Sequence, residues 1–194
     1  MGTFSYETVA RIVRECYQRL AERAPGSPAL VIFTERFARE RLKAAAQAQG
    51  VAEKEVPEVL FVCANNAGRS VMAAALVERL AGGRAHVRSA GSDPTNEIHA
   101  TVVTVMAEAG VDVSSEFPKP LSDQVVAAAD VVVTMGCGDA CPVYPGKRYV
   151  DWAVDDPAGR SVEEVRRIRE DIDQRVRALL AELVGGSKAV SGGR

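Results

Sequence analysis

The first 50 residues carry apolar side chains at helical spacing. Positions 9, 12, 13, 16, 17 and 20 are apolar and follow the i, i+3, i+4 pattern of one helix face. Residues 25–28, which include two prolines and a glycine, break this pattern. The spacing therefore predicts a helix over 4–22 and further helix, in one or two pieces, over 29–49. The polar residues 50–57 end in proline and predict a linker.

From residue 58 onward the pattern changes to short apolar runs that alternate with helical stretches. The runs predict strands at 58–64, 85–91, 129–136 and 147–154, and helices are predicted over 71–82, 99–110 and 161–186. Ser161 and Glu164 have the spacing of a capping box at the start of the last helix. Strands alternating with helices predict an α/β fold with a central four-stranded parallel sheet. We therefore expect a helical domain over 1–50, an α/β domain over 57–185 and a flexible tail over 186–194.

Composition and charge exclude several classes of protein. With 47% hydrophobic and 26% charged residues, the chain has an ordinary globular composition. A net charge of -2 argues against binding to nucleic acid or an anionic membrane, and no apolar run approaches the ~20 residues that span a bilayer. The N-terminus lacks the pattern of an export signal. We therefore expect a cytoplasmic protein whose four cysteines are reduced, reactive or metal-binding rather than structural disulfides.

Cys63 ends the first predicted strand and begins the sequence C-x5-R-S. In parallel sheets, ligands bind at the carboxyl ends of strands. The five following residues can wrap so that their backbone N–H groups point at one tetrahedral anion, which Arg69 would close with a bidentate fork. Ser70 can hydrogen-bond the sulfur, and the same field favours the thiolate form of Cys63. The predicted oxyanion-binding residues are Ala64, Asn65, Asn66, Ala67, Gly68, Arg69 and Ser70, of which Asn66 and Gly68 suit positive φ angles.

Two further cysteines follow the third predicted strand. Cys137 comes directly after it and Cys141 lies four positions on, with Gly136 and Gly138 making the segment deformable. A parallel strand would bring Cys137 to the same sheet edge as Cys63. A zinc site is an alternative, but the two histidines are not at ligand spacing, so we predict no metal. Two merely structural cysteines are a second alternative. Cys16, on the apolar helix face, is predicted to be a buried packing thiol.

The sequence resembles the low-molecular-weight protein tyrosine phosphatases. The resemblance rests on the C-x5-R-S loop, on Ser-Ala-Gly at 89–91 and on Asp-Asp-Pro-Ala-Gly at 155–159. It implies the three-layer fold of that family. In the family an aspartate before a distant proline is the general acid, which implies that role for Asp156, with Asp155 as the alternative. A turn-forming Asp-Pro pair without catalytic function is the remaining interpretation.

With its additional cysteines, the chain resembles the arsenate reductases built on this phosphatase fold, across roughly residues 57–185. That resemblance implies that Cys63 attacks arsenate, Cys137 then attacks the Cys63 sulfur to release arsenite, and Cys141 moves the disulfide outward. It implies no metal or organic cofactor. It also implies an external reductant, either thioredoxin or mycothiol with mycoredoxin, because residues 135–152 look like actinobacterial members.

Other functions remain open from the sequence. The chain could be a tyrosine phosphatase in which Cys137 and Cys141 are bystanders, although such enzymes commonly have tyrosine after the Asp-Pro pair. It could also be a module that senses arsenate or phosphate without catalysis. Nine basic and seven acidic residues over 1–56 argue against a DNA-binding helix-turn-helix. We expect residues 1–50 to form a homodimer interface, with docking onto the chain's own sheet as the alternative.

Overall fold

The computed structural model describes residues 3–137 and 143–185. Cys141 and the predicted tail 186–194 lie outside these residues. The helices and strands, in chain order, are α1 (Tyr6–Ala21), α2 (Leu30–Ala48), β1 (Glu58–Cys63), α3 (Arg69–Ala81), β2 (His86–Gly91), α4 (Ala100–Glu108), α5 (Asp123–Ala128), β3 (Val131–Met135), β4 (Arg148–Asp151) and α6 (Val162–Gly185). The predicted elements are present, α2 is a single helix, and the short helix α5 is an addition to the prediction.

The four strands form one parallel sheet in the order β2-β1-β3-β4. Cys63, the last residue of β1, stands opposite Gly91 of β2 on one side and Met135 of β3 on the other. The carboxyl ends of three strands therefore meet at one sheet edge. The predicted α/β class with a four-stranded parallel sheet is confirmed, and so is the capping box, in which Glu164 N–H donates to Ser161 Oγ and Ser161 N–H donates to Glu164.

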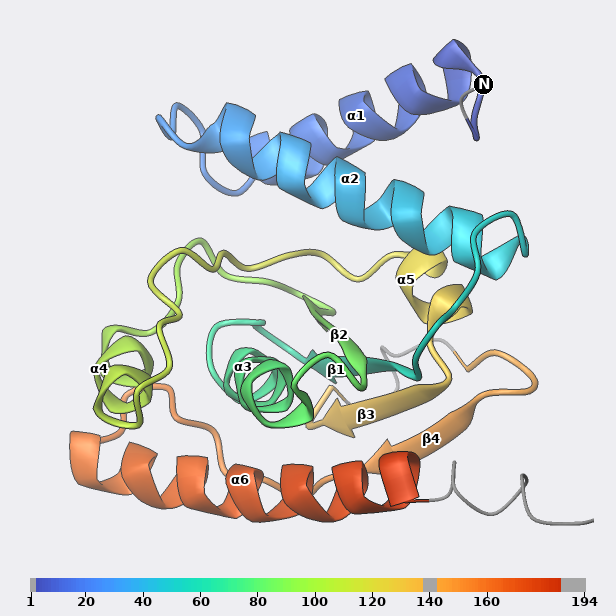
Figure 1. Ribbon diagram of the computed structural model, residues 1–194. Coiled ribbons are helices and arrows are strands. Elements are labelled where there is room, and N and C mark those ends of the chain that lie inside the picture. Colours follow the sequence, from blue (N-terminus) through green and yellow to red (C-terminus); the bar gives the residue numbers. More distant parts are fainter. Residues whose placement is uncertain (1–2, 138–142, 186–194) are drawn as a thin grey trace, which may run out of the picture.

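Helices cover both faces of this sheet (Figure 1). Val59 and Phe61 of β1 point into a core shared with α3, α4 and α6. The intervening residues Leu60 and Val62 point to the opposite face, where they pack against α5 and Ala44 of α2. This alternation follows from the twofold period of a strand. The three-layer arrangement is thus completed on one side by α2, which belongs to the helical extension.

The helical extension docks onto the chain's own sheet. Helices α1 and α2 pack against each other through buried Ile12, Cys16 and Phe37, and the ring of Phe33 stacks on that of Phe117 with centroids 4.3 Å apart. The structure therefore shows docking within the chain, which the sequence left as the alternative, and the homodimer stays a prediction. Cys16 is fully buried in this packing, as predicted. None of the helices that the structure describes is long and apolar enough to cross a membrane.

A buried charge network ties α2 to the amino ends of β1 and β2. The Glu58 carboxylate accepts hydrogen bonds from Arg88, from Gln47 at 2.6 Å and from His86 at 2.8 Å. Glu58 and Arg88 are 2% and 3% exposed. Burial alone would raise the pKa of Glu58, but the hydrogen bond from His86 and the charge of Arg88 outweigh it and hold this pKa below its usual value. The carboxylate is thus satisfied by three donors, although Arg88 Nε is a buried donor without a hydrogen-bond partner among the described residues.

Candidate active site

The oxyanion loop, residues 64–68, connects the end of β1 to the start of α3. Cys63 is 1% exposed, and its Sγ lies 3.0 Å from Ser70 Oγ. The backbone N–H of Asn66 donates to the same sulfur at 3.2 Å. The sulfur therefore lies at the N-terminal end of α3, in contact with the Ser70 hydroxyl and one backbone donor. The expected contact between Ser70 and the sulfur is therefore present.

Asn66 holds the loop in shape. Its φ of 46° is the one positive φ among the described non-glycine residues, so the prediction of a left-handed turn there is confirmed. Its Nδ2 donates to Ser70 Oγ at 2.8 Å, and its Oδ1 accepts from the backbone N–H of Lys119 at 2.8 Å. The side chain thus closes a network between both ends of the loop and the 115–121 segment.

Gly68 is required for a different reason from the one predicted. Its φ is -149°, so the expectation of a positive φ at this position is wrong. A Cβ at residue 68 would instead lie 2.4 Å from Pro157 Cγ. The glycine is needed because the Asp-Pro segment presses against the loop at this point.

Arg69 and Asp156 meet beside the loop. Arg69 Nη2 donates to Asp156 Oδ2 at 2.7 Å, and Asp156 Oδ1 accepts from Ala158 N–H at 3.0 Å. Asp155 is exposed, so Asp156 is the aspartate that the structure brings to the loop. A carboxyl group next to the anion-binding arginine can deliver a proton to an oxygen that leaves the bound anion.

A second loop, residues 92–99, braces the first and was not predicted. Its backbone N–H groups, from residues 92, 93, 95 and 99, donate to the carbonyl oxygens of residues 63, 64, 65 and 67 at 2.9–3.1 Å. These bonds occupy the loop carbonyl oxygens on the side of the 92–99 loop. Such backbone pairing has no side-chain signature, which is why sequence patterns did not reveal it.

Cys137 lies at the same sheet edge as Cys63, as predicted, because it follows β3 by two residues. Its side chain, however, is 8% exposed and packs in the core on the α2 and α5 face, whereas Cys63 belongs to the core on the other face. Gly136 turns the chain with φ +70°, and a Cβ there would lie 2.7 Å from Arg69 Nη1. Cys137 is disulfide-bonded and Cys63 is a free thiol.

Two protein-family models match the sequence of the chain. Residues 58–188 match the family model of the low molecular weight phosphotyrosine protein phosphatases, which covers more than half of the chain. The chain belongs to this family. Residues 1–46 match a separate model, the N-terminal domain of protein-tyrosine-phosphatase-like proteins.

Within the family, the chain is similar to arsenate reductases. The structure of a thioredoxin-dependent arsenate reductase from Corynebacterium glutamicum is 46% identical, covers 96% of this chain and 90% of its own, and superposes with a TM-score of 0.86. A glutaredoxin arsenate reductase from Synechocystis is 33% identical over 129 residues, which are 65% of this chain and 98% of the relative. The arginine phosphatase of Geobacillus stearothermophilus shares the fold, with 23% identity and a TM-score of 0.61 over 71% of this chain and 99% of its own. The expected resemblance to arsenate reductases is confirmed.

Proposed function

We propose that the protein reduces arsenate to arsenite by a three-cysteine relay regenerated by thioredoxin. The observation that carries the proposal is the placement of Cys63 in an oxyanion loop beside Arg69 and Asp156, at the sheet edge where Cys137 follows β3. The relatives named as arsenate reductases support the same chemistry, and one of them matches nearly the whole chain.

In the first step, the Cys63 thiolate attacks the arsenic of bound arsenate. The loop N–H groups and Arg69 hold the arsenate oxygens, since both are donors that suit a tetrahedral dianion. An As–O bond breaks and Asp156 gives its proton to the departing oxygen, which leaves as water. The product is a covalent Cys63 thiol-arsenate adduct in which arsenic is still pentavalent.

In the second step, the Cys137 thiolate of the reduced protein attacks the Cys63 sulfur, so the disulfide that Cys137 forms in the structure must be reduced first. A Cys63–Cys137 disulfide forms while the S–As bond breaks, and the bonding pair stays on arsenic, which leaves as arsenite. Cys141 then attacks Cys137, so that Cys63 is freed and a Cys137–Cys141 disulfide remains. An external dithiol reduces this disulfide and completes the cycle. No metal or organic cofactor takes part.

The reductant in this proposal is thioredoxin. The Corynebacterium glutamicum relative is named as thioredoxin-dependent, which supports the choice. The Synechocystis relative is named for glutaredoxin, so family membership alone does not decide the reductant. Mycothiol with mycoredoxin is the alternative, and turnover assays with each reductant in separate reactions distinguish them.

A phosphatase is the second candidate, because the matched family model describes phosphatases and phosphate is a tetrahedral oxyanion like arsenate. Ala158 stands where such enzymes commonly carry tyrosine after Asp-Pro, which favours the reductase. A phosphatase would also need neither Cys137 nor Cys141. The two functions therefore make opposite predictions for variants of these cysteines.

The experiment is arsenate turnover with thioredoxin, thioredoxin reductase and NADPH for Cys63→Ser, Cys137→Ser and Cys141→Ser. We expect all three variants to lose multiple turnover, and Cys16→Ser, the matched control, to retain it. Phosphatase activity on an aryl phosphate should be lost in Cys63→Ser alone. If Cys137→Ser keeps full turnover with thioredoxin, the relay is wrong.

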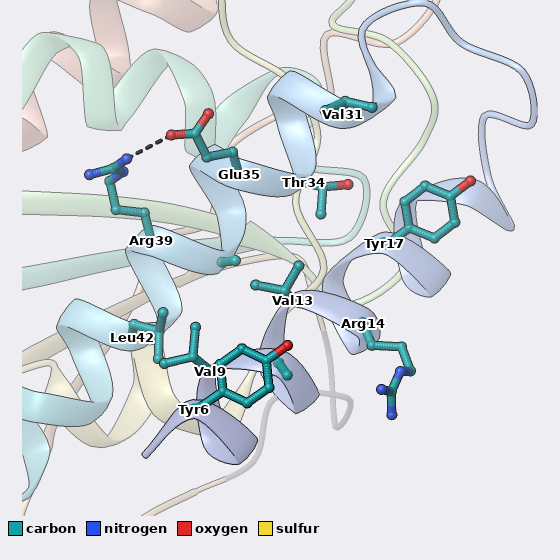
Figure 2. Close-up of a pocket in the computed structure, with 12 residues that line it drawn as sticks. Tyr6, Val9, Val13, Arg14, Tyr17, Val31, Thr34, Glu35, Arg39 and Leu42 are labelled. Atoms are coloured by element: carbon teal, nitrogen blue, oxygen red, sulfur yellow. Dashed lines mark hydrogen bonds and ion pairs between the residues drawn. The ribbon is translucent and has the colours of Figure 1, made fainter. Parts of the chain in front are cut away.

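We further propose that residues 1–50 act as an oligomerisation unit, distinct in role from the α/β domain over 57–185, and form a homodimer. Figure 2 shows an apolar groove between α1 and α2. Tyr6, Val13 and Val31 line it and are 86%, 39% and 73% exposed. The rim carries Arg39 paired with Glu35. In a twofold homodimer the same apolar face of both copies would be buried, with these charged residues at its rim.

The homodimer proposal is tested by Val13→Glu in the full chain, since deletion of 1–50 would uncover the sheet face that α2 protects. We expect sedimentation to show a dimer for the wild type and a monomer for Val13→Glu. A matched change on an exposed residue outside the groove, Glu170→Lys on α6, should leave the dimer intact. A monomeric wild-type protein would refute the proposal.

A further inference from the structure

The helical extension contacts the α/β domain next to the oxyanion loop. Arg23, in the connection between α1 and α2, donates from Nη1 to Asp93 Oδ1 at 3.1 Å and to the carbonyl oxygen of Pro94. Asp93 and Pro94 belong to the 92–99 loop, whose backbone braces residues 63–67. Arg23 therefore binds the outer side of the segment whose inner side holds the oxyanion loop.

A second contact from the extension reaches the oxyanion loop by another route. Phe33 of α2 stacks on Phe117, and Arg36 Nη1 donates to the carbonyl oxygen of Ser115 at 2.6 Å. Two residues beyond Phe117, the backbone N–H of Lys119 donates to Asn66 Oδ1. Asn66 is the strained residue of the oxyanion loop, so this contact supports the position where the loop most needs support.

Between the two contacts lies a small cavity of about 40 Å³, lined by residues of the extension and of both bracing segments. Leu20, Arg23 and Phe33 line it from one side, and Thr95 and Phe117 from the other. The two sides are therefore not packed continuously here. The distance between the extension and the 92–99 loop depends on the polar contacts of Arg23 rather than on close packing.

We propose that Arg23 is a positioning residue for oxyanion binding: it holds the 92–99 loop, and through it the N–H groups of residues 64–68, in the geometry that receives the anion. The physical reason is that several N–H groups must point at one anion at once. A small shift of the bracing loop weakens all of these hydrogen bonds together. Arg23 is itself partly exposed and does not touch the anion site, so it acts through the loop.

The proposal rests on the oxyanion-binding part of the proposed function and not on the redox relay. Its test measures binding of inorganic phosphate as protection of Cys63 from iodoacetamide, in the full chain with Cys16, Cys137 and Cys141 changed to serine. Cys63 is then the one thiol in the sequence. If the chain with all four cysteines shows no arsenate turnover but the phosphate result below is obtained, the reductase proposal fails and this inference stands.

We expect Arg23→Ala to raise the phosphate Kd by about fivefold, because misaligned donors bind a dianion less tightly. Arg23→Lys, which can still donate to the Pro94 carbonyl oxygen, should restore part of the affinity. Arg177→Ala is the matched control: Arg177 lies on α6, has a side chain that is 60% exposed and pairs with Asp173 of its own helix, so its loss should leave Kd unchanged. In arsenate turnover, Arg23→Ala should raise KM more than it lowers kcat.

A phosphate Kd for Arg23→Ala equal to that of Arg177→Ala would overturn the inference. Circular dichroism of each variant shows whether the helices persist. If Arg23→Ala is unfolded, Asp93→Ala replaces it as the test, because it removes one of the two acceptors of Arg23 and keeps the arginine. We then expect a phosphate Kd raised about twofold, in keeping with the loss of one exposed contact, and an unchanged Kd would again overturn the inference.

Discussion

The two ends of the β-sheet use charge in opposite ways. At the amino end, Glu58 and Arg88 are buried together and bonded to Gln47 of α2. At the carboxyl end, Arg69 is also largely buried, but its carboxylate partner Asp156 has a side chain that is 44% exposed. One end is a closed network, and the other is open on the side where an anion would enter.

The difference shows what separates a structural arginine from a binding arginine in this fold. Arg88 has a permanent counter-charge, so removing that charge should cost stability and spare activity. Arg69 has a counter-charge that solvent or substrate can reach, so an anion can share or replace it. Changes at the open end should therefore reduce activity and spare stability. The following predictions test this contrast.

The largest effect on activity is expected from Arg69→Lys. An ammonium group cannot donate two parallel bonds to an oxyanion while also contacting Asp156, so kcat/KM for arsenate should fall by about 10³-fold. The free energy of unfolding, measured by urea denaturation, should change by less than about 1 kcal/mol. A kcat/KM within tenfold of the wild type would show that Arg69 is not the anion-binding group.

At the closed end, Glu58→Gln should destabilise the protein by about 3 kcal/mol at pH 7, because Arg88 would be left buried without a counter-charge. Urea denaturation measures this change, and kcat/KM of the folded protein should stay within twofold. Glu182→Gln, at the exposed ion pair of α6 with Arg148, is the matched control and should cost less than about 0.5 kcal/mol. Equal stability of the two variants would contradict the closed-network interpretation.

The stability difference between the wild type and Glu58→Gln should depend on pH. The pKa of Glu58 is lower in the folded protein than its ordinary value of 4.5, so its contribution to stability is complete above that value. It is lost as the pH falls through the lowered folded-state pKa. Urea denaturation should therefore show a stability difference between wild type and Glu58→Gln that is constant near neutral pH and shrinks below pH 4.5. A difference that grows on acidification would contradict the sign of the shift.

A smaller loss of activity is expected from Asp156→Asn. An amide keeps a hydrogen bond to Arg69 through its oxygen but cannot supply a proton, so single-turnover formation of arsenite should slow by about 10²-fold. Asp155→Asn, one residue earlier and exposed, is the control and should have little effect. If Asp155→Asn causes the larger loss, the assignment of the general acid must be reversed.

The smallest effect among these is expected from Gly136→Ala. A Cβ there would approach Arg69 Nη1 to 2.7 Å and would be strained at φ +70°. The displaced guanidinium should lower kcat/KM about tenfold, with phosphate and arsenate affinity both reduced. Gly146→Ala is a matched control, since Gly146 has a similar φ of +76° but nothing within 4 Å of its added Cβ. Equal activity losses in the two variants would indicate backbone strain rather than displacement of Arg69.

Much of the fold and of the catalytic loop was predictable because both have local signatures. The spacing of apolar residues predicted both long α-helices of the extension and the four strands. The C-x5-R-S motif predicted the position of the oxyanion loop. The downstream Asp-Pro pair led to Asp156, which the structure places on Arg69. These features depend on residues that lie close in sequence or on a motif of fixed spacing.

The features that were missed depend on contacts between distant segments. The bracing by residues 92–99 consists of backbone hydrogen bonds, and the need for glycine at 68 arises from Pro157, which lies 89 positions later in the chain. Helix α5 has six residues, too few to establish a helical period. The placement of Cys137 on the opposite core face also depends on how Gly136 turns the chain, which a strand pattern does not reveal.

The central claim is that Cys137 leaves its buried position and reaches the Cys63 sulfur after arsenate has bound. The most direct measurement uses reduced Cys141→Ser, which cannot pass the disulfide outward. After a single turnover with arsenate, peptide mass spectrometry should find one Cys63–Cys137 disulfide for each arsenite released. Arsenite release with Cys63 and Cys137 still unlinked, or no release without a small added thiol, would contradict the relay.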